Sequence, residues 1–288
     1  MALKILTLNI HGYQEENQLE KFDIIADNIA ANNYDIIALQ EVSQTEENEP
    51  VFVREDDPTQ TMRANNPIYI IGKRLKEKYG IEYFSHWVNI KMGFVIYQEG
   101  IAIMSKLPII KGETIVACCD EYNDMKDSKR RALAKTKLDY NGTPINIYSI
   151  HFGLASEAKN PFILQFTKLH EDIKKNGDEL TIFLGDFNIP DYSDEYQKIL
   201  EHGYTDLYET AKTKSDQRAT IAGFIHGWES NDKPLRIDFG FSNRAYDPIN
   251  IIQGFWLAIF TGASRYIYAD WLRYDTTLQT IFEIDKLP

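Results

Sequence analysis

The spacing of hydrophobic and polar residues predicts that the chain begins with a strand, a helix and a second strand. Residues 4–10 alternate in the two-residue period of a strand. A helix should follow, because Asn17 and Glu20 have the spacing of a capping box and the apolar residues after them fall on one helical face. Residues 36–41 are an apolar run that ends on Gln40 and Glu41, which predicts a buried strand.

The rest of the pattern adds more strands, a hairpin and two further helices. The dipeptide Asn141-Gly142 is a strong hairpin signal between two strand-like segments. Asn160-Pro161 is a typical helix start. Strands are predicted over 100–104, 114–119, 132–139, 144–150, 180–184, 237–241 and 276–284, helices over 74–79 and after residue 161, and a polar surface loop over 46–66. This order favours mixed sheets with helices outside, and functional residues where strand ends converge.

Composition and charge restrict the kind of protein. The 288 residues, 43% of them hydrophobic, can bury a large core, and no linker or repeat divides them, so we expect one domain over 1–288. The net charge of −12 disfavours nucleic acid as a partner, because affinity for nucleic acid comes largely from Lys and Arg. A local basic patch would still permit it. A small phosphorylated substrate bridged by a metal suits the acidic surface better.

The cysteines and the longest apolar run indicate a cytoplasmic protein. Cys118 and Cys119 are adjacent and poorly placed for a disulfide, so we expect reduced thiols within a strand. The first residues show no charged leader followed by an apolar stretch. The apolar run 254–260 is far shorter than the ~20 residues that span a bilayer.

Several predicted strands end on polar residues that suit a metal and phosphate site. These residues are Asn9, Glu41, His151, Asp186, Asn188 and Asp238. Taken singly, each is more often a turn residue than a catalyst. As a set they are more informative, because a carboxylate inside an apolar run, as at Asp238, costs several kcal/mol or more unless a partner or metal compensates it. One shared cation would resolve several of these costs.

Ligand chemistry suggests a role for each residue. Mg²⁺ prefers oxygen ligands and binds through one or two carboxylates plus substrate phosphate, so Glu41 is the natural ligand with the Asn9 amide oxygen nearby. Asp186, oriented by Asn188, would position or deprotonate a water, and His151 would donate a hydrogen bond to a phosphate oxygen. In the basic cluster 129–131, Arg130 and Arg131 are either a solvated surface or a clamp on a substrate phosphate.

These segments occur in an order that resembles a known enzyme family. The motifs are Thr7-Leu8-Asn9, Leu39-Gln40-Glu41, the strand 99–106, Ser149-Ile150-His151, Gly185-Asp186-Phe187-Asn188 and Arg236-Ile237-Asp238. They resemble the endonuclease/exonuclease/phosphatase superfamily over roughly residues 1–253. The resemblance implies an α/β (α+β) four-layer sandwich, in which two mixed β-sheets pack face to face with helices outside. It also implies Mg²⁺ or Mn²⁺ dependence and a water nucleophile. Segments 9–19, 223–228 and 235–238 look similar to a bacterial sugar-phosphate phosphatase branch that includes maltose 6′-phosphate phosphatase.

One motif departs from the family pattern. The family closes with Ser-Asp-His, whose histidine pairs with the aspartate at position 238, whereas this chain reads Ala269-Asp270-Trp271. The resemblance makes Asp270 a metal ligand but leaves Asp238 without an imidazole, and indole cannot accept a proton. His226 or His11 would then substitute, or the enzyme would turn over more slowly.

We therefore expect a metal-dependent phosphomonoesterase that acts on a small phosphorylated metabolite such as a sugar phosphate. One alternative is a phosphodiesterase, either a nuclease, which a basic groove around the site would favour, or a sphingomyelinase-like lipid hydrolase, which an exposed aromatic hairpin would favour. The other is a binding protein that has lost turnover through Trp271.

Overall fold

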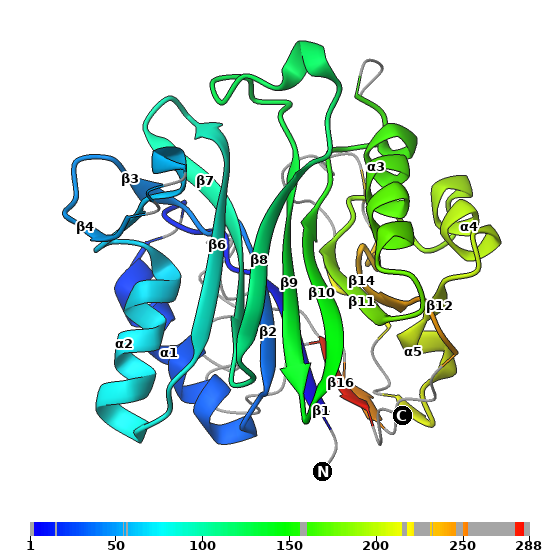
Figure 1. The fold of residues 1–288 in the computed structure, drawn as a ribbon, viewed down its shortest axis with the longest axis horizontal. Coiled ribbons are helices and arrows are strands. Elements are labelled where there is room, and N and C mark those ends of the chain that lie inside the picture. The colour runs from blue at the N-terminus through cyan, green and yellow to red at the C-terminus, as the bar shows by residue number, and fades with distance from the viewer. Residues whose placement is uncertain are drawn as a thin grey trace.

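The first of the two large sheets contains the start of the chain (Figure 1), and β4 (Pro50–Phe52) and β5 (Met62–Arg63) form a small third sheet. The computed structural model describes residues 3–14, 16–53, 55, 57–155, 160–214, 218–221, 231, 233–245, 250–252 and 280–284. This sheet has the order β13-β15-β16-β1-β2-β7-β3, with β6 also paired to β7. Its strands are β1 (Leu3–Asn9), β2 (Ile36–Gln40), β3 (Gln44–Thr45), β6 (Phe84–Gly93), β7 (Tyr97–Ser105), β13 (Thr213–Lys214), β15 (Asn250–Ile252) and β16 (Thr280–Ile284). β1 and β2 are parallel, so both end at the same edge.

The second sheet has six strands in the order β12-β14-β11-β10-β9-β8. They are β8 (Ile109–Val116), β9 (Ala132–Tyr140), β10 (Thr143–His151), β11 (Leu180–Asp186), β12 (Thr205–Asp206) and β14 (Asp238–Ser242). Asn141 and Gly142 join β9 to β10 with positive φ angles of 52° and 85°, the left-handed backbone that a two-residue hairpin turn requires. β10 and β11 run parallel and also end together.

Three hydrophobic clusters separate the four layers. The middle cluster joins Ile5 and Ile103 of the first sheet to Ala134, Ile147 and Ile182 of the second. A second cluster packs α1 (Gln18–Asn32) and α2 (Pro67–Tyr79) on the first sheet, and a third packs α3 (Phe162–Lys175) and α4 (Asp194–Glu201) on the second. Figure 1 shows these helices on opposite outer faces, which confirms the predicted four-layer sandwich of two mixed sheets.

The shorter elements mark where the chain differs from the predicted pattern. The stretch 46–66, predicted as a loop, contains β4 (Pro50–Phe52), the 3-10 helix η1 (Pro58–Gln60) and β5 (Met62–Arg63). The sequence pattern did not predict β6, α4 or the short helix α5 (Leu207–Thr210). Asn17 precedes α1 in the left-handed conformation and makes no side-chain cap, so the predicted capping box is wrong.

Cys118 and Cys119 are free thiols, as predicted, but they follow β8 instead of lying within it. Cys118 is buried beside the 3-10 helix η2 (Asp120–Tyr122), where its thiol donates to the Tyr122 carbonyl. Within the described ranges, no helix combines the length and apolar character that a bilayer crossing requires.

Candidate active site

The predicted site residues come from both sheets and lie at the ends of their strands. Asn9 ends β1, Glu41 directly follows β2, His151 ends β10 and Asp186 ends β11. Asp238 begins the antiparallel strand β14 and pairs in register with Asp186. Parallel pairing within each sheet brings these ends to one edge.

Asn9 connects the carboxylates of the two sheets. Its Nδ2 donates to Glu41 Oε1 at 2.8 Å and to Asp186 Oδ2 at 3.3 Å. Its Oδ1 accepts from the backbone N–H of His11 at 3.1 Å, which orients the amide nitrogen toward the carboxylates. Asn9 therefore holds Glu41 and Asp186 together. Ligation of a metal by its oxygen stays a prediction.

His151 and Asn188 both approach Asp186. His151 Nε2 lies 4.0 Å from Asp186 Oδ2. The backbone N–H of Asn188 donates to Asp186 Oδ1 at 2.9 Å, and its side-chain Nδ2 donates to the Phe152 carbonyl at 2.9 Å. Asn188 thus orients Asp186 through its backbone. Its positive φ of 51° turns the chain sharply after the end of β11.

Glu41, Asp186 and Asp238, here called the acidic cluster, are partly accessible but enclosed by protein. Burial raises the pKa of Glu41, and Asn9 and His11 oppose this rise. Burial, and then the charge of Asp238, raises the pKa of Asp186 well above its usual value. Burial also raises the pKa of Asp238 to about 6. The cluster therefore lacks enough nearby positive charge to favour full ionisation.

Burial holds the pKa of His151 well below its usual range, and the charges of Arg131 and Lys91 lower it further. The imidazole is thus neutral near pH 7. A neutral ring carries one N–H and can donate one hydrogen bond to a substrate oxygen.

The donor set fits a hard divalent cation. Among the described residues, no three His, Cys, Asp or Glu side chains gather closely enough to hold a metal ion by themselves. Mg²⁺ seldom needs such a set, because it retains waters and takes one or two carboxylates plus substrate phosphate. A cation beside the acidic cluster would also relieve the cost of ionising its carboxylates.

Two further residues lie beside Glu41. Gln14 Nε2 donates to Glu41 Oε2 at 2.7 Å, and His11 Nε2 lies 3.9 Å from the same oxygen. His11 thus accompanies Glu41, and its replacement of the imidazole expected beside Asp238 stays a prediction. The sequence signal for both residues was weak, because they follow β1 in an irregular turn in which His11 has positive φ.

Thr220 orients Asp238. Its hydroxyl oxygen accepts from the backbone N–H groups of Ile237 at 3.1 Å and Asp238 at 3.2 Å, and the hydroxyl hydrogen-bonds to the Asp238 carboxylate and lowers its pKa. Because both N–H groups occupy the hydroxyl's acceptor capacity, its proton is free to be donated to the carboxylate.

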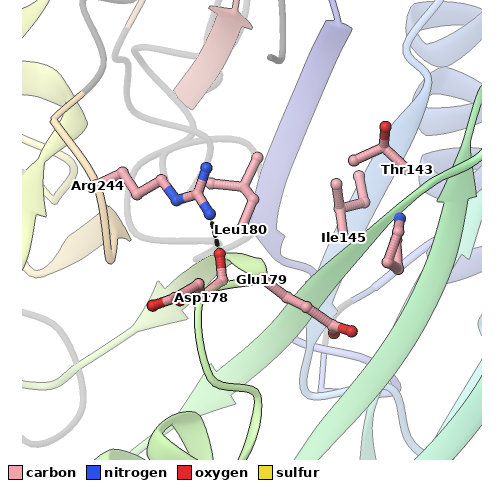
Figure 2. A pocket seen from close by; sticks show the side chains of 7 residues that line it. Thr143, Ile145, Asp178, Glu179, Leu180 and Arg244 are labelled. Atoms are coloured by element: carbon pink, nitrogen blue, oxygen red, sulfur yellow. Dashed lines mark hydrogen bonds between the residues drawn. The ribbon is translucent and has the colours of Figure 1, made fainter.

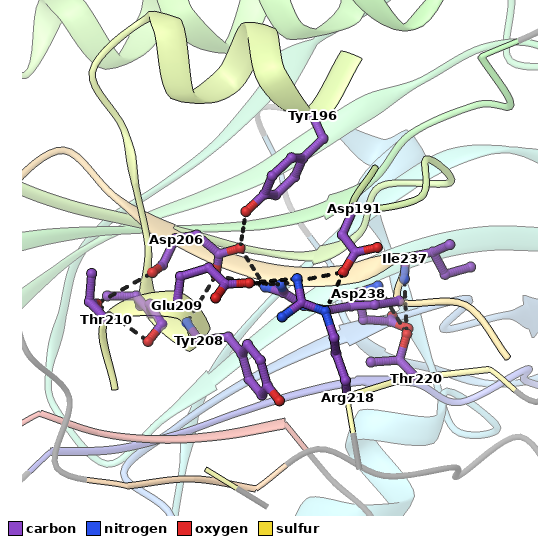
Figure 3. Close-up of polar contacts among 12 residues, drawn as sticks. Asp191, Tyr196, Asp206, Tyr208, Glu209, Thr210, Arg218, Thr220, Ile237 and Asp238 are labelled. Atoms are coloured by element: carbon purple, nitrogen blue, oxygen red, sulfur yellow. Dashed lines mark hydrogen bonds and ion pairs between the residues drawn. The ribbon is translucent and has the colours of Figure 1, made fainter. Parts of the chain in front are cut away.

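A buried ion network fixes the segment before Asp238 (Figure 3). Arg236 Nη2 contacts both oxygens of Asp206, at 2.6 and 2.5 Å, and both side chains are 1% exposed. Tyr196 also donates to Asp206, at 2.8 Å. The guanidinium lies 4.6 Å from the ring centroid of Tyr208. Arg236 and Asp206 are 30 positions apart in the sequence, and the sequence pattern gave no sign of their pairing.

The two predicted phosphate-binding arginines differ in their surroundings. Arg130 is buried and donates to the carbonyls of Ile90 and Asn123, so its guanidinium anchors the loop before β9. Arg131 is half-buried, precedes β9 and lies within electrostatic reach of His151. Arg130 is therefore engaged within the protein, and binding of a substrate phosphate by Arg131 stays a prediction.

Three residues that bear on the C-terminal part of the site lie outside the described residues. They are Asp270, predicted as a metal ligand, Trp271 and His226. Their roles stay predictions.

A separate pocket of about 340 Å³ lies at the opposite ends of β10 and β11 (Figure 2). Its lining includes Thr143, Leu180 and Arg244, whose guanidinium donates to the Asp178 carbonyl. Because β10 and β11 start here and finish at His151 and Asp186, this pocket is distinct from the acidic cluster.

Comparison with known proteins agrees with this fold. A family model for the Endonuclease/Exonuclease/phosphatase family matches residues 6–247. The chain belongs to this family of hydrolytic, divalent-metal-dependent phosphoesterases. No curated protein matches it.

Solved structures share the architecture. A family protein from Leptotrichia buccalis is 27% identical with a TM-score of 0.79, covering 99% of each chain. A mannosyl-6-phosphatase from Bacteroides thetaiotaomicron is 14% identical with a TM-score of 0.64, over 99% of this chain and 100% of that one. A mutant beta toxin from Staphylococcus aureus with bound magnesium ions is 16% identical with a TM-score of 0.58, over 88% of each.

Proposed function

We propose that this protein is a Mg²⁺- or Mn²⁺-dependent phosphomonoesterase that uses water to hydrolyse a small phosphorylated metabolite such as a sugar phosphate. The observation that carries the proposal is the convergence of the acidic cluster, Asn9 and a neutral His151 at one edge of both sheets. The overall acidity, with a net charge of −12, favours a small substrate over nucleic acid. The similar mannosyl-6-phosphatase fold is in keeping with a sugar phosphate.

Each residue has a role that its contacts support. Glu41, held by Asn9 and Gln14, binds the divalent cation, and by family resemblance Asp270 adds a second carboxylate. When bound, the cation polarises the phosphoryl oxygen and offsets the charge that develops there. Asp186, oriented by Asn188, accepts the proton of the attacking water.

His151, beside Asp186, donates a hydrogen bond from its neutral ring to a non-bridging phosphate oxygen, and the low pKa of the imidazole keeps the ring neutral for this role. Asp238, oriented by Thr220, supports Asp186 in the adjacent strand. Metabolites of this kind are abundant in the cytoplasm, where we propose that the enzyme acts.

Phosphate release from a panel of sugar phosphates tests this proposal. We expect turnover with Mg²⁺ or Mn²⁺, none after EDTA, and recovery when metal is restored. Asp186→Asn should lower kcat about 10²- to 10⁴-fold, the contribution of one acid–base group. Asp27→Asn, which removes an exposed carboxylate on α1 that pairs with Lys78 of α2 and with no residue of the site, is the control. Turnover that is indifferent to EDTA would refute the proposal. Binding of Mg²⁺ and phosphate with no turnover of any ester would favour a binding protein.

A lipid phosphodiesterase is a second candidate because of the hairpin between β6 and β7. At its tip Phe94, Val95 and Ile96 are 68%, 88% and 58% exposed, and the first two have positive φ. Such a projecting apolar tip suits contact with a lipid surface. Cleavage of phospholipid in vesicles that is lost in Phe94→Ser, with no release from sugar phosphates, would favour this candidate.

A further inference from the structure

Two cationic side chains approach each other within electrostatic reach of His151. Lys91 lies on β6 and Arg131 in the loop before β9. Lys91 Nζ donates to the Ser128 carbonyl at 3.0 Å, and Arg131 Nη1 donates to the same oxygen at 2.9 Å. Because they share one acceptor, the two nitrogens are no farther apart than about 6 Å.

The loop that carries Arg131 is held against β6 on both sides of Lys91. The Met92 N–H donates to the Met125 carbonyl at 2.7 Å, and Arg130 donates to the Ile90 carbonyl. The two cations are thus fixed by the fold and do not meet by chance rotation of surface side chains.

The positive charge of this pair is only partly neutralised. Lys91 pairs with Glu99 Oε1 at 3.3 Å, across the β6–β7 register. Arg131 has no carboxylate within ion-pair distance among the described residues, and its buried Nε has no hydrogen-bond partner there. Two adjacent cations with one carboxylate between them leave a net positive charge, which an anion would stabilise.

This pair lies next to the groups proposed to act on the phosphate. The charges of Arg131 and Lys91 both reach His151, and that of Lys91 also reaches Glu41. The Val42 N–H, directly after Glu41, donates to Gly100 O at 2.7 Å, which brings the Lys91–Glu99 pair close to the acidic cluster. The edge therefore has an acidic half suited to a cation and a basic half suited to an anion.

We propose that Lys91 and Arg131 form a cationic clamp on the terminal oxygens of a phosphomonoester dianion, and that this clamp selects monoesters over diesters. The inference rests on the proposed function and adds the basis of its substrate choice. A phosphomonoester carries close to two charges near pH 7 because its second pKa is about 6, whereas a diester carries one. The arginine fork also suits two oxygens of one phosphate, and a diester blocks one of them with its second substituent.

Inorganic phosphate binding to the Mg²⁺-loaded protein, measured by calorimetry, tests the clamp without requiring turnover. Lys91→Met and Arg131→Met should each weaken phosphate binding about 10- to 100-fold, the range for a charge-assisted hydrogen bond. Arg131→Lys keeps the charge and should lose less. Lys111→Met removes an exposed lysine that pairs with Glu113 and should change nothing. Unchanged phosphate affinity in both Met variants would overturn the proposal.

Variants of Glu99 distinguish a phosphate clamp from a simple ion pair between Lys91 and Glu99. If Lys91 binds phosphate, Glu99→Gln should strengthen phosphate binding. Lys91→Met/Glu99→Gln should bind more tightly than Lys91→Met, because an unpaired carboxylate is removed, but should stay well below the wild-type affinity. If Lys91 serves only to neutralise Glu99, the double variant would recover wild-type affinity, and the clamp would be refuted.

The ratio of kcat/KM for a sugar phosphate to that for bis(p-nitrophenyl) phosphate tests the selectivity. We expect this ratio to fall about tenfold or more in Lys91→Met and Arg131→Met, mainly through a higher KM for the monoester. An unchanged ratio would refute the role in selectivity. A wild-type protein that binds phosphate through both residues but hydrolyses no ester would refute the proposed function and leave the clamp intact.

Discussion

The buried pair of Arg236 and Asp206 provides a quantitative test of how the chain before Asp238 is fixed. Both side chains are 1% exposed, and both carboxylate oxygens contact the guanidinium. Arg236→Met keeps much of the side-chain volume but leaves Asp206 charged and enclosed. Removing one partner of a buried pair costs about 3–5 kcal/mol. For a chain of this size, that corresponds to a melting temperature lower by roughly 6–10 °C.

Arg218 is a matched control because it shares acidic neighbours with Arg236. It contacts Asp191 at 2.7 Å and Glu209 at 2.6 Å, yet its side chain is 49% exposed. Exposed ion pairs contribute about 0.2–1 kcal/mol, so Arg218→Met should lower the melting temperature by roughly 2 °C or less.

Urea unfolding and calorimetry measure both variants. Adding Asp206→Asn to Arg236→Met should recover part of the loss, because the uncompensated charge is removed while asparagine can still cap α5. The difference in burial predicts unequal losses of unfolding free energy. A loss below about 1 kcal/mol for Arg236→Met, or equal losses for Arg236→Met and Arg218→Met, would show that burial does not determine the strength of the Arg236–Asp206 pair.

Three further predictions concern the site. Thr220→Val should lower kcat about 10-fold or more while Thr220→Ser keeps it, as measured by steady-state kinetics, because serine retains the hydroxyl that orients Asp238. Gly185→Ala should cost more than about 4 kcal/mol in urea unfolding, because its φ is 147° and a Cβ there would lie 2.0 Å from Ile150 O. The acidic cluster has raised pKa values, so its contribution to stability is complete below pH ~4 and is lost as pH rises through the folded pKa, about 6 for Asp238. This loss of stability amounts to up to about 3 kcal/mol for Asp238. A bound cation would compensate the ionised carboxylates, so Mg²⁺ should raise the melting temperature more at pH 8 than at pH 5.

The sequence predicted the site best where the chemistry coincides with a strand end. Asn9, His151 and Asp186 each follow an apolar run, and parallel pairing brings such ends together whatever the loops between them do. The hairpin at Asn141-Gly142 was predictable for a similar reason, because positive φ at both positions restricts the residues that fit.

Other features depend on contacts that no local pattern records. β6 has buried His86 and Asn89 among its apolar residues, so its period is obscured. In the fold, His86 Nε2 hydrogen-bonds to the Glu113 carbonyl, and Asn89 Nδ2 donates to the Thr59 carbonyl. Arg130 and Arg131 are adjacent in sequence. The folded loop buries the side chain of Arg130 and places the charge of Arg131 within reach of His151. Thr220 gains its role because its segment folds back on Asp238.

Polar contacts between the two sheets determine how the sheets are aligned with each other. Apolar faces attract without direction and tolerate sliding, but Gln40 Nε2 donates to Ser149 Oγ at 3.0 Å, and this hydroxyl donates to the Leu39 carbonyl at 3.2 Å. Together with the hydrogen bond from Asn9 to Asp186, these directional contacts fix the alignment of the two sheets. Sliding of one sheet over the other would have to break these hydrogen bonds, so the reacting groups keep their separation.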